Sequence, residues 1–282
     1  MLSSQGGGAE RSGLWRSVAA HGGVILLILI LLFPFLWLLQ MSFKPEKEIL
    51  AFPPRLLFRP TLEHYHAIWS GQFHRSFANS TIVSMISTVL SLALGVPAAY
   101  SLSRARLGAE SQIALWVLAT RMVPPIAFTI PFFLAYRHLE WLDTLHGLIL
   151  IYLTFNLSLV IWMMRTFFDS LPRALDEAAL VDGAGVWGTF FRVVLPLSAP
   201  GFAATAIFCF LLSWNDFFFA LILTRTRAMT APVAVVNFMN YEGWQWGKIA
   251  AGGAMVMLPV VVFSILVRNY MVRGLTAGAV KG

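Results

Sequence analysis

The chain has 282 residues, of which 58% are hydrophobic and only 12% are charged, and its mean hydropathy is +0.75. A soluble domain of this length needs far more polar surface, so the composition excludes a soluble fold and predicts an all-α polytopic membrane protein. The net charge of +7 comes from scattered Lys and Arg, which suits contact with anionic lipid and lacks the clustering of a nucleic-acid-binding surface.

Six apolar segments are each long enough, at roughly 20 residues, to cross a bilayer as a helix. They are expected near residues 22–41, 77–102, 112–135, 145–166, 200–224 and 249–268. The first segment is too long for the apolar region of a signal peptide, so we predict an uncleaved span. The chain then divides into an N-terminal segment 1–21, a first span with its loop 22–76, a transmembrane core 77–268 and a tail 269–282.

The Lys and Arg residues are divided almost equally between alternate loops, so charge alone gives little information about orientation. The short basic loop 103–111, which begins Ser-Arg-Ala-Arg, favours both termini in the cytoplasm.

The third apolar segment contains an arginine and a broken-helix signal. Arg121 stands near Pro124, Pro125 and Pro131. Proline frees backbone carbonyls, which are tolerated in a membrane only where protein or water satisfies them. Two interpretations remain open: Arg121 and Pro124 belong to a solute path or gate, or Arg121 pairs with the freed carbonyls or a neighbouring subunit.

Segment 167–199, between the fourth and fifth spans, has the pattern of two short helices at the membrane surface. Asp176 and Glu177 lie early in the first helix, where acids complement the helix dipole. Gly183 can end that helix with a positive φ. A second helix is expected over 186–194.

Leu195 and Pro196 should end this second helix, because proline blocks its continuation. The small residues Ala178, Ala179 and Ala184 near the bend permit close approach by a partner. The pattern alone leaves two interpretations open: a docking surface, or an amphipathic pair that caps the bundle.

Trp214, Asn215 and Asp216 lie deep in the fifth segment. Three roles remain open for Asp216: it lines a solute path, it pairs with a group across a subunit interface, or its carboxylate reaches the membrane surface by snorkelling. Asn and Asp side chains hydrogen-bond sugar hydroxyls and aromatic rings stack on sugar CH faces, although a membrane-interface belt also supplies aromatics.

The loop before the sixth segment contains a cluster of Tyr241, Trp244, Gln245 and Trp246. It is either a contact loop for an external protein or an interfacial anchor. His64 and His66 are weak evidence for a metal, and we predict no metal site.

The chain lacks the G-x-x-x-x-G-K-[ST] phosphate-binding loop, since Gly247-Lys248 is followed by Ile249 and Glu242 stands where the first glycine belongs. We therefore expect no cofactor in this chain.

The series Glu177-Ala178-Ala179, Gly183, Val193 and Leu195-Pro196 resembles the EAA signature of ABC-importer permeases, with Val193 where the family usually has Ile. The segments TRMVPPIAFTIP, SWNDFFFALILT and RGLTAGAVKG are similar to the carbohydrate branch, specifically its maltose-transporter-like six-span subunit. The resemblance covers nearly the whole chain after the first span begins.

This resemblance implies that the hairpin is a cytoplasmic coupling helix docking into an ATPase subunit. It also implies that this partner ATPase binds ATP and Mg and supplies the ATP hydrolysis, since this chain lacks a phosphate-binding loop. The implied docking residues are Asp176, Glu177, Ala178, Ala179, Gly183, Ala184, Leu195 and Pro196. It also implies that the loop with Trp244 meets a solute-binding protein. A short chain end of this kind is usually disordered. The resemblance implies instead that the tail contacts the ATPases, through Gly274, Leu275, Thr276 and Lys281.

We therefore expect a non-enzymatic permease subunit that carries a sugar, polyol or related solute across a bacterial inner membrane. Its expected partners are a second permease, an ABC ATPase dimer, an external solute-binding protein and lipid, but no nucleic acid. A membrane-embedded glycosyltransferase would need clustered carboxylates or histidines. A stand-alone secondary transporter would need matching broken helices in two repeats, and the sequence contains only one proline-rich broken span of that kind.

Overall fold

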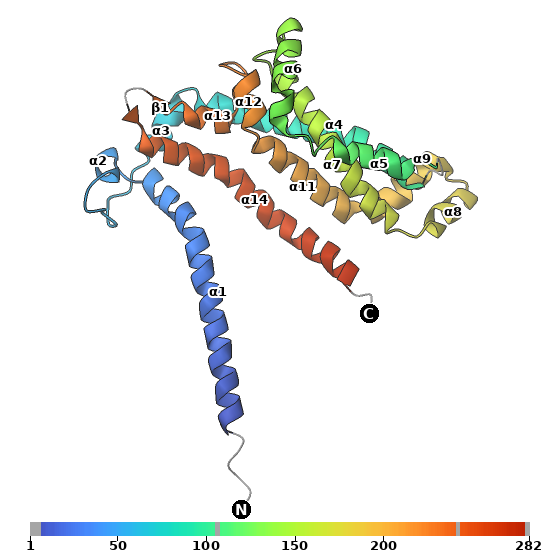
Figure 1. The fold of residues 1–282 in the computed structure, drawn as a ribbon, viewed down its shortest axis with the longest axis horizontal. Coiled ribbons are helices and arrows are strands. Elements are labelled where there is room, and N and C mark those ends of the chain that lie inside the picture. The colour runs from blue at the N-terminus through green and yellow to red at the C-terminus, as the bar shows by residue number, and fades with distance from the viewer. Residues whose placement is uncertain (1–6, 105–107, 241–242, 280–282) are drawn as a thin grey trace, which may run out of the picture.

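The structure is a computed structural model that describes residues 7–104, 108–240 and 243–279 (Figure 1). Within these ranges the chain is predominantly helical, as predicted. The strands found there are the two-residue pair β1 (Met239–Asn240) and β2 (Gly243–Trp244), which are antiparallel.

Four long helices form the frame of the molecule. They are α1 (Gly7–Ser42), α4 (Phe73–Arg104), α7 (Leu145–Asp169) and α14 (Trp246–Ala279). Each contains a stretch long and apolar enough to cross a membrane. A bent pair, Gly185–Leu197 with Ala199–Trp214, makes a fifth candidate. The described residues thus contain four or five such elements, and the count of six spans stays a prediction.

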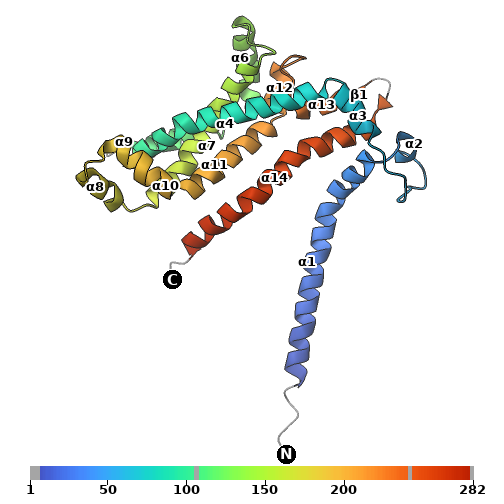
Figure 2. The same ribbon diagram turned by 180° about the vertical axis from the view of Figure 1, so that it is seen from behind.

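The core lies where α4 and α7 run side by side and α11 (Ala199–Trp214) packs on both (Figures 1 and 2). Close approach depends on small residues: a Cβ at Gly95 would lie 2.7 Å from Cγ1 of Val160. Buried serines follow the same face of α4, at Ser80, Ser84, Ser87 and Ser91. Small residues of this kind let membrane helices pack backbone to backbone.

Helix α1 departs from the rest of the bundle and meets it only near its own C-terminal end (Figure 1). There the hydroxyls of Ser42 and Tyr65 lie 2.8 Å apart. The apolar side chains between residues 24 and 36 are mostly exposed. Inside a membrane, such a surface contacts lipid or another subunit.

The third predicted span is two helices, α5 (Glu110–Ala119) and α6 (Pro125–His138), with Arg121 in the turn between them. The fifth is also broken, between α11 and α12 (Phe218–Leu223), although it contains no proline at the break. There the backbone N–H of Ala220 donates to Oδ2 of Asp216 at 3.1 Å. The proline-rich break expected from the sequence is therefore accompanied by a second break without proline, where a side-chain carboxylate competes for a backbone N–H.

The short elements gather at opposite ends of the bundle. At the end where α4 begins lie α2 (Glu46–Ile49), α3 (Glu63–Ser70), α13 (Ala231–Val236) and the β1–β2 pair (Figure 1). At the other end lie α8 (Ala174–Val181), α9 (Gly185–Thr189), the π-helical η1 (Phe190–Val194) and α10 (Leu195–Leu197).

Candidate functional site

The EAA-like segment forms a hairpin of α8 and α9 that projects from one end of the bundle (Figure 2). Asp176 and Glu177 occupy the first turn of α8, as predicted. Gly183 has a φ of 80° and follows the last residues of that helix, which confirms the predicted left-handed end. Gly185 also has a positive φ of 62°, so two glycines together reverse the chain.

The second arm of the hairpin does not stop at Leu195-Pro196, so that prediction was wrong. Helical structure continues through Pro196 to Leu197, and the axis then bends by 79° into α11. The five residues of η1 precede the proline, and the N–H of Leu195 bonds the carbonyl of Phe190, five residues back. We attribute the tolerance of Pro196 to this wider π-helical turn, which relieves the usual clash of the proline ring.

The tip and outer face of the hairpin are apolar and exposed. Val181 is 88% exposed, and Val186, Trp187 and Phe191 are also exposed. The rings of Trp187 and Phe191 stack with centroids 5.9 Å apart. Exposed apolar side chains grouped beside charged ones are typical of a protein-binding surface.

The predicted docking residues separate into outward and inward groups. Glu177, Ala178, Gly183 and Pro196 are exposed, Ala184 and Leu195 are half-buried, and Ala179 and Asp176 are buried. Asp176 accepts hydrogen bonds from Tyr100 and Arg104 of α4. The two neighbouring acids therefore differ in burial and pairing: Asp176 is buried and bound to α4, whereas Glu177 is exposed, although both line a cavity of about 430 Å³ beside Tyr100 and Arg104.

A mostly apolar cavity of about 210 Å³ with several polar groups on its wall lies between the two broken helices and α7. It is lined by Arg121, Val123, Pro125, Tyr152, Phe155, Asn156, Leu212, Ser213, Asp216 and Phe219. The structure thus brings Arg121 and Asp216 to one site from breaks far apart in the sequence. Nη1 of Arg121 is shielded from solvent and has no hydrogen-bond partner among the described residues.

Hydrogen bonds order the polar wall of this cavity. The Tyr152 hydroxyl donates to Asp216 at 2.8 Å, and Nδ2 of Asn156 donates to Oγ of Ser213 at 2.7 Å. The rings of Phe155 and Phe219 stack on the apolar side, with centroids 4.9 Å apart. The cavity therefore offers hydrogen-bonding groups beside an aromatic face.

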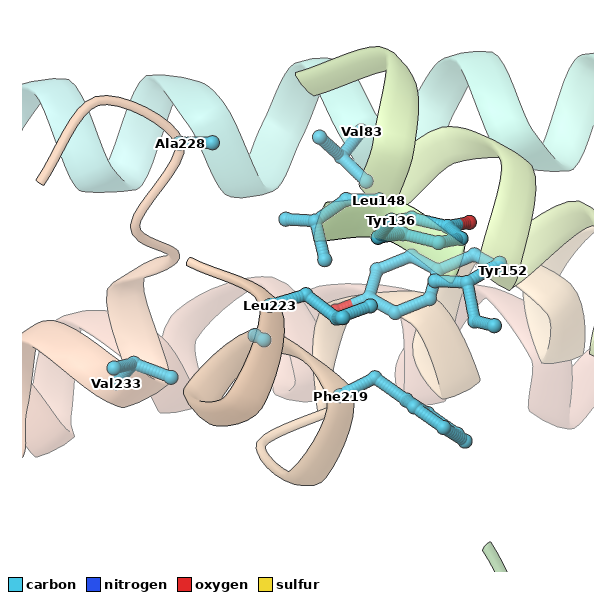
Figure 3. Packing of buried hydrophobic residues seen from close by; sticks show 10 residues of the cluster. Val83, Tyr136, Leu148, Tyr152, Phe219, Leu223, Ala228 and Val233 are labelled. Carbon is cyan, nitrogen blue, oxygen red and sulfur yellow. The ribbon is translucent and has the colours of Figure 1, made fainter. Parts of the chain in front are cut away.

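Packing of α6, α7 and α12 holds the cavity walls in place. Figure 3 shows Tyr136, Leu148 and Tyr152 gathered with Phe219 and Leu223 in one apolar cluster.

Trp214 and Asn215, which were predicted for the solute path, do not line this cavity. Trp214 is buried in the core, where its indole N–H donates to the carbonyl of Val256 at 3.0 Å. Asn215 is exposed, and its amide bonds the carbonyl of Leu211 in its own helix. Pro124 immediately precedes α6.

At the end of the bundle opposite the hairpin, Asp143 anchors a loop. It lies in the turn between α6 and α7, and its carboxylate accepts backbone N–H bonds from Arg225, Thr226, Arg227 and Ala228 at 2.9–3.2 Å. Partial burial acts to raise the pKa of this carboxyl, but the backbone donors outweigh it and lower the pKa to about 2.

The aromatic loop lies near the same end of the bundle. Trp244 is 54% exposed and its ring lies 4.8 Å from that of Trp246, while the N–H of Gln245 bonds the carbonyl of Phe238. Tyr241 falls outside the described residues.

His64 in the neighbouring helix α3 is buried, with Nε2 2.8 Å from the carbonyl oxygen of Lys44. Among the described residues, no three His, Cys, Asp or Glu side chains are grouped so that they could hold a metal ion.

Residues 91–273 match the protein family described as "Binding-protein-dependent transport system inner membrane component". The chain belongs to this family. The permease is 37% identical to the probable ABC transporter permease protein y4oR of Sinorhizobium fredii, over 90% of this chain and 92% of that one. It is 35% identical to the trehalose/maltose transport system permease protein MalG of Thermococcus litoralis, over 92% of this chain and 95% of that one.

The permease has the same fold as a chain in the crystal structure of a bacterial ABC transporter that imports the acidic polysaccharide alginate. The TM-score is 0.76 at 24% identity, with 95% of this chain and 99% of that chain covered. The family and the apolar helices identify a multi-pass inner-membrane protein, and its relatives are transport components.

Three polar residues of the cavity wall, Tyr152, Asn156 and Ser213, were not predicted from the sequence. Tyr152 and Asn156 are four residues apart and therefore lie on one face of α7, so two polar groups at helical spacing in an apolar span were a usable signal.

Helix α14 extends through Gly274, Leu275 and Thr276, so this part of the tail is helical, and its contact with ATPases stays a prediction. Lys281 falls outside the described residues.

Proposed function

We propose that this permease forms one half of the pore of an ABC importer that carries a sugar, polyol or related solute. Separate ATPase subunits, which bind ATP and Mg, drive alternating access. The observation that carries the proposal is the family match over residues 91–273 together with a hairpin whose apolar face is exposed. Relatives include MalG of a trehalose/maltose system and, at 36% identity, the trehalose transport system permease protein SugB of Mycobacterium tuberculosis.

The proposed ATPase-docking surface is the outer face of the hairpin. Glu177 supplies a charge, and Val181, Val186, Trp187 and Phe191 supply apolar area beside it. An ATPase is cytoplasmic, so this proposal puts the hairpin and both termini on the cytoplasmic side. The helical tail with Gly274, which continues α14, is proposed to contact the ATPases as well.

The proposed solute path includes the cavity lined by Arg121, Tyr152 and Asp216. Its Asn156, Ser213 and Asp216 groups suit the hydroxyls of a sugar, and Phe155 with Phe219 suits the CH face of a sugar ring. The volume of about 210 Å³ is below the range of about 300–1,000 Å³ typical of pockets for drug-sized ligands, so the cavity fits part of a larger solute.

The proposed external contact is the aromatic loop. Exposed Trp244, backed by Trp246, offers an anchor to a solute-binding protein. A solved relative of the same fold is an alginate ABC transporter in complex with an alginate pentasaccharide-bound periplasmic protein, at 19% identity and a TM-score of 0.69 over 95% of this chain and 97% of that one. The exposed face of α1 is proposed to contact lipid and the second permease.

Purification of the tagged permease from its native membrane in mild detergent tests the proposal. We expect an ATPase with a phosphate-binding loop and a second permease to accompany it. Glu177→Lys should lose the ATPase and keep the second permease, whereas Asp182→Asn, which removes an exposed acid from the same hairpin, should keep both. Purification of the wild-type chain alone would contradict the proposal and favour a stand-alone secondary transporter.

A further inference from the structure

The two acids at the start of α8 have different surroundings, and the buried one joins the hairpin to α4. We propose that Tyr100, Arg104 and Asp176 form a rigid junction, so that the hairpin and the C-terminal end of α4 move as one body. Asp176 is then a positioning residue that makes no ATPase contact. The inference rests on the proposed docking of an ATPase on the hairpin.

The junction engages both oxygens of a buried carboxylate. Asp176 is 8% exposed, and its Oδ1 accepts from the Tyr100 hydroxyl at 2.6 Å. Its Oδ2 accepts from Nε of Arg104 at 3.0 Å, in an ion pair whose side chains are 14% and 11% exposed. Exposed ion pairs add little to stability, but a shielded, doubly hydrogen-bonded carboxylate has one defined position.

The remaining donors of Arg104 bind a third element. Nη1 donates to the carbonyl of Phe168 at 3.0 Å and Nη2 to that of Leu171 at 3.3 Å, at the end of α7 and just beyond it. One planar guanidinium thus joins α4, the end of α7 and α8. Lysine has a single ammonium and lacks this fork, so it does not reproduce the geometry.

Both arms of the hairpin meet at Tyr100. Asp176 reaches it from the first arm, and Phe190 of the second arm packs against its ring with centroids 5.1 Å apart. Phe168 of α7 lies against the same ring at 5.7 Å. A displacement of either arm therefore pushes on the same residue of α4.

Helix α4 extends from this junction to the opposite end of the bundle. Its 32 residues span about 48 Å. Near its start, Nδ2 of Asn79 donates to the carbonyls of Arg227 and Met229, and Oγ of Ser80 accepts the N–H of Ala231. On the way, Ser87 bonds Ser213, a residue of the cavity wall. Movement of the hairpin would reach the cavity through α4.

Spin-label distances within the chain test whether the junction is rigid. Leu175, 37% exposed on α8 and outside the proposed docking surface, and Leu94, 56% exposed on α4, are replaced by labelled cysteines. The native Cys209 is buried and does not compete. The permease is assembled with its partner permease and ATPases in nanodiscs, and the distance is measured without nucleotide and with a non-hydrolysable ATP analogue bound.

In the wild type we expect the same distance in both states. In Arg104→Gln and Asp176→Asn we expect it to shift by roughly 2 Å or more on ATP binding, the scale on which packed helices slide. Arg104→Lys should shift less than Arg104→Gln, and Tyr100→Phe least, because its ring still packs between Phe168 and Phe190. These two milder variants keep the test decisive if the others fail to assemble.

The matched control is Asp182→Asn, which removes an exposed acid from the same hairpin and should leave the distance constant. A wild-type distance that changes on ATP binding, or Arg104 and Tyr100 variants as rigid as the wild type, would overturn the junction. Loss of the ATPase from Asp176→Asn, as expected for Glu177→Lys, would return Asp176 to the docking surface and also overturn it. Absence of any ATPase from the wild-type assembly would instead defeat the proposed function.

Discussion

Asp176 and Asp143 hold opposite ends of the bundle by different chemistry. Asp176 is bound by two side chains, Tyr100 and Arg104, which belong to one helix. Asp143 is bound by four successive backbone N–H groups of a loop that lies more than 80 residues away in the sequence. The first arrangement depends on the identity of its partners. The second depends mainly on the path of the backbone, with one side-chain bond, from the Thr226 hydroxyl at 3.3 Å.

The comparison predicts that side-chain substitutions act strongly at the hairpin end and weakly at the loop end. Arg104→Ala should cause the largest loss, about 3–5 kcal/mol of unfolding free energy, because it leaves a buried carboxylate without its cation. Denaturation of the purified permease in detergent measures this. Arg173→Ala, which removes one hydrogen bond from an exposed arginine to the Ser103 carbonyl, should cost much less, and equal losses would contradict the assignment.

Asp143→Asn should rank second, with a loss of about 1–2 kcal/mol, because an amide oxygen accepts fewer and weaker bonds than a carboxylate while the loop N–H groups keep some access to water. Proteolysis of the intact permease should then cut the loop 224–230 faster. An unchanged rate of cleavage would show that the loop is held by other contacts.

Acid should weaken the hydrogen bonds between the Asp143 carboxylate and the loop 224–230, because the carboxylate becomes protonated. Its pKa is lowered from the ordinary 3.8 to about 2, so the ionised form is favoured in the folded state. Its contribution to stability is therefore complete above about pH 4 and is lost as pH falls towards 2. Denaturation midpoints between pH 5 and 2.5 should fall less for Asp143→Asn than for the wild type, and parallel curves would contradict the prediction.

The smallest effect is expected at the loop itself. Arg225→Ala and Arg227→Ala remove side chains but keep the N–H groups that bind Asp143. Each should change the unfolding free energy by no more than about 0.5 kcal/mol, as is usual for surface substitutions. A loss as large as that of Asp143→Asn would mean that the arginine side chains, and not the backbone, hold the loop.

Local rules predicted much of the hairpin. Asp176 and Glu177 lie in a first turn, and Gly183 has a positive φ at the helix end, as the residue types alone indicate. The expectation that proline ends a helix failed at Pro196, because the preceding π-helical turn changes the hydrogen bonds that a proline would otherwise interrupt. The positions of the prolines also gave no sign of the break at Asp216, where the carboxylate accepts the backbone N–H of Ala220.

By itself the sequence determined the membrane class, the family-like signature and the turn of the hairpin, because these depend on composition and on neighbours a few residues apart. Only the tertiary structure decided that Asp176 is buried against α4 while Glu177 is exposed, and that Arg121 and Asp216 share a cavity. Adjacent acids are equivalent in a sequence pattern. They become different when a distant helix supplies Tyr100 and Arg104 to one of them, since burial and pairing arise from contacts between segments far apart in the chain.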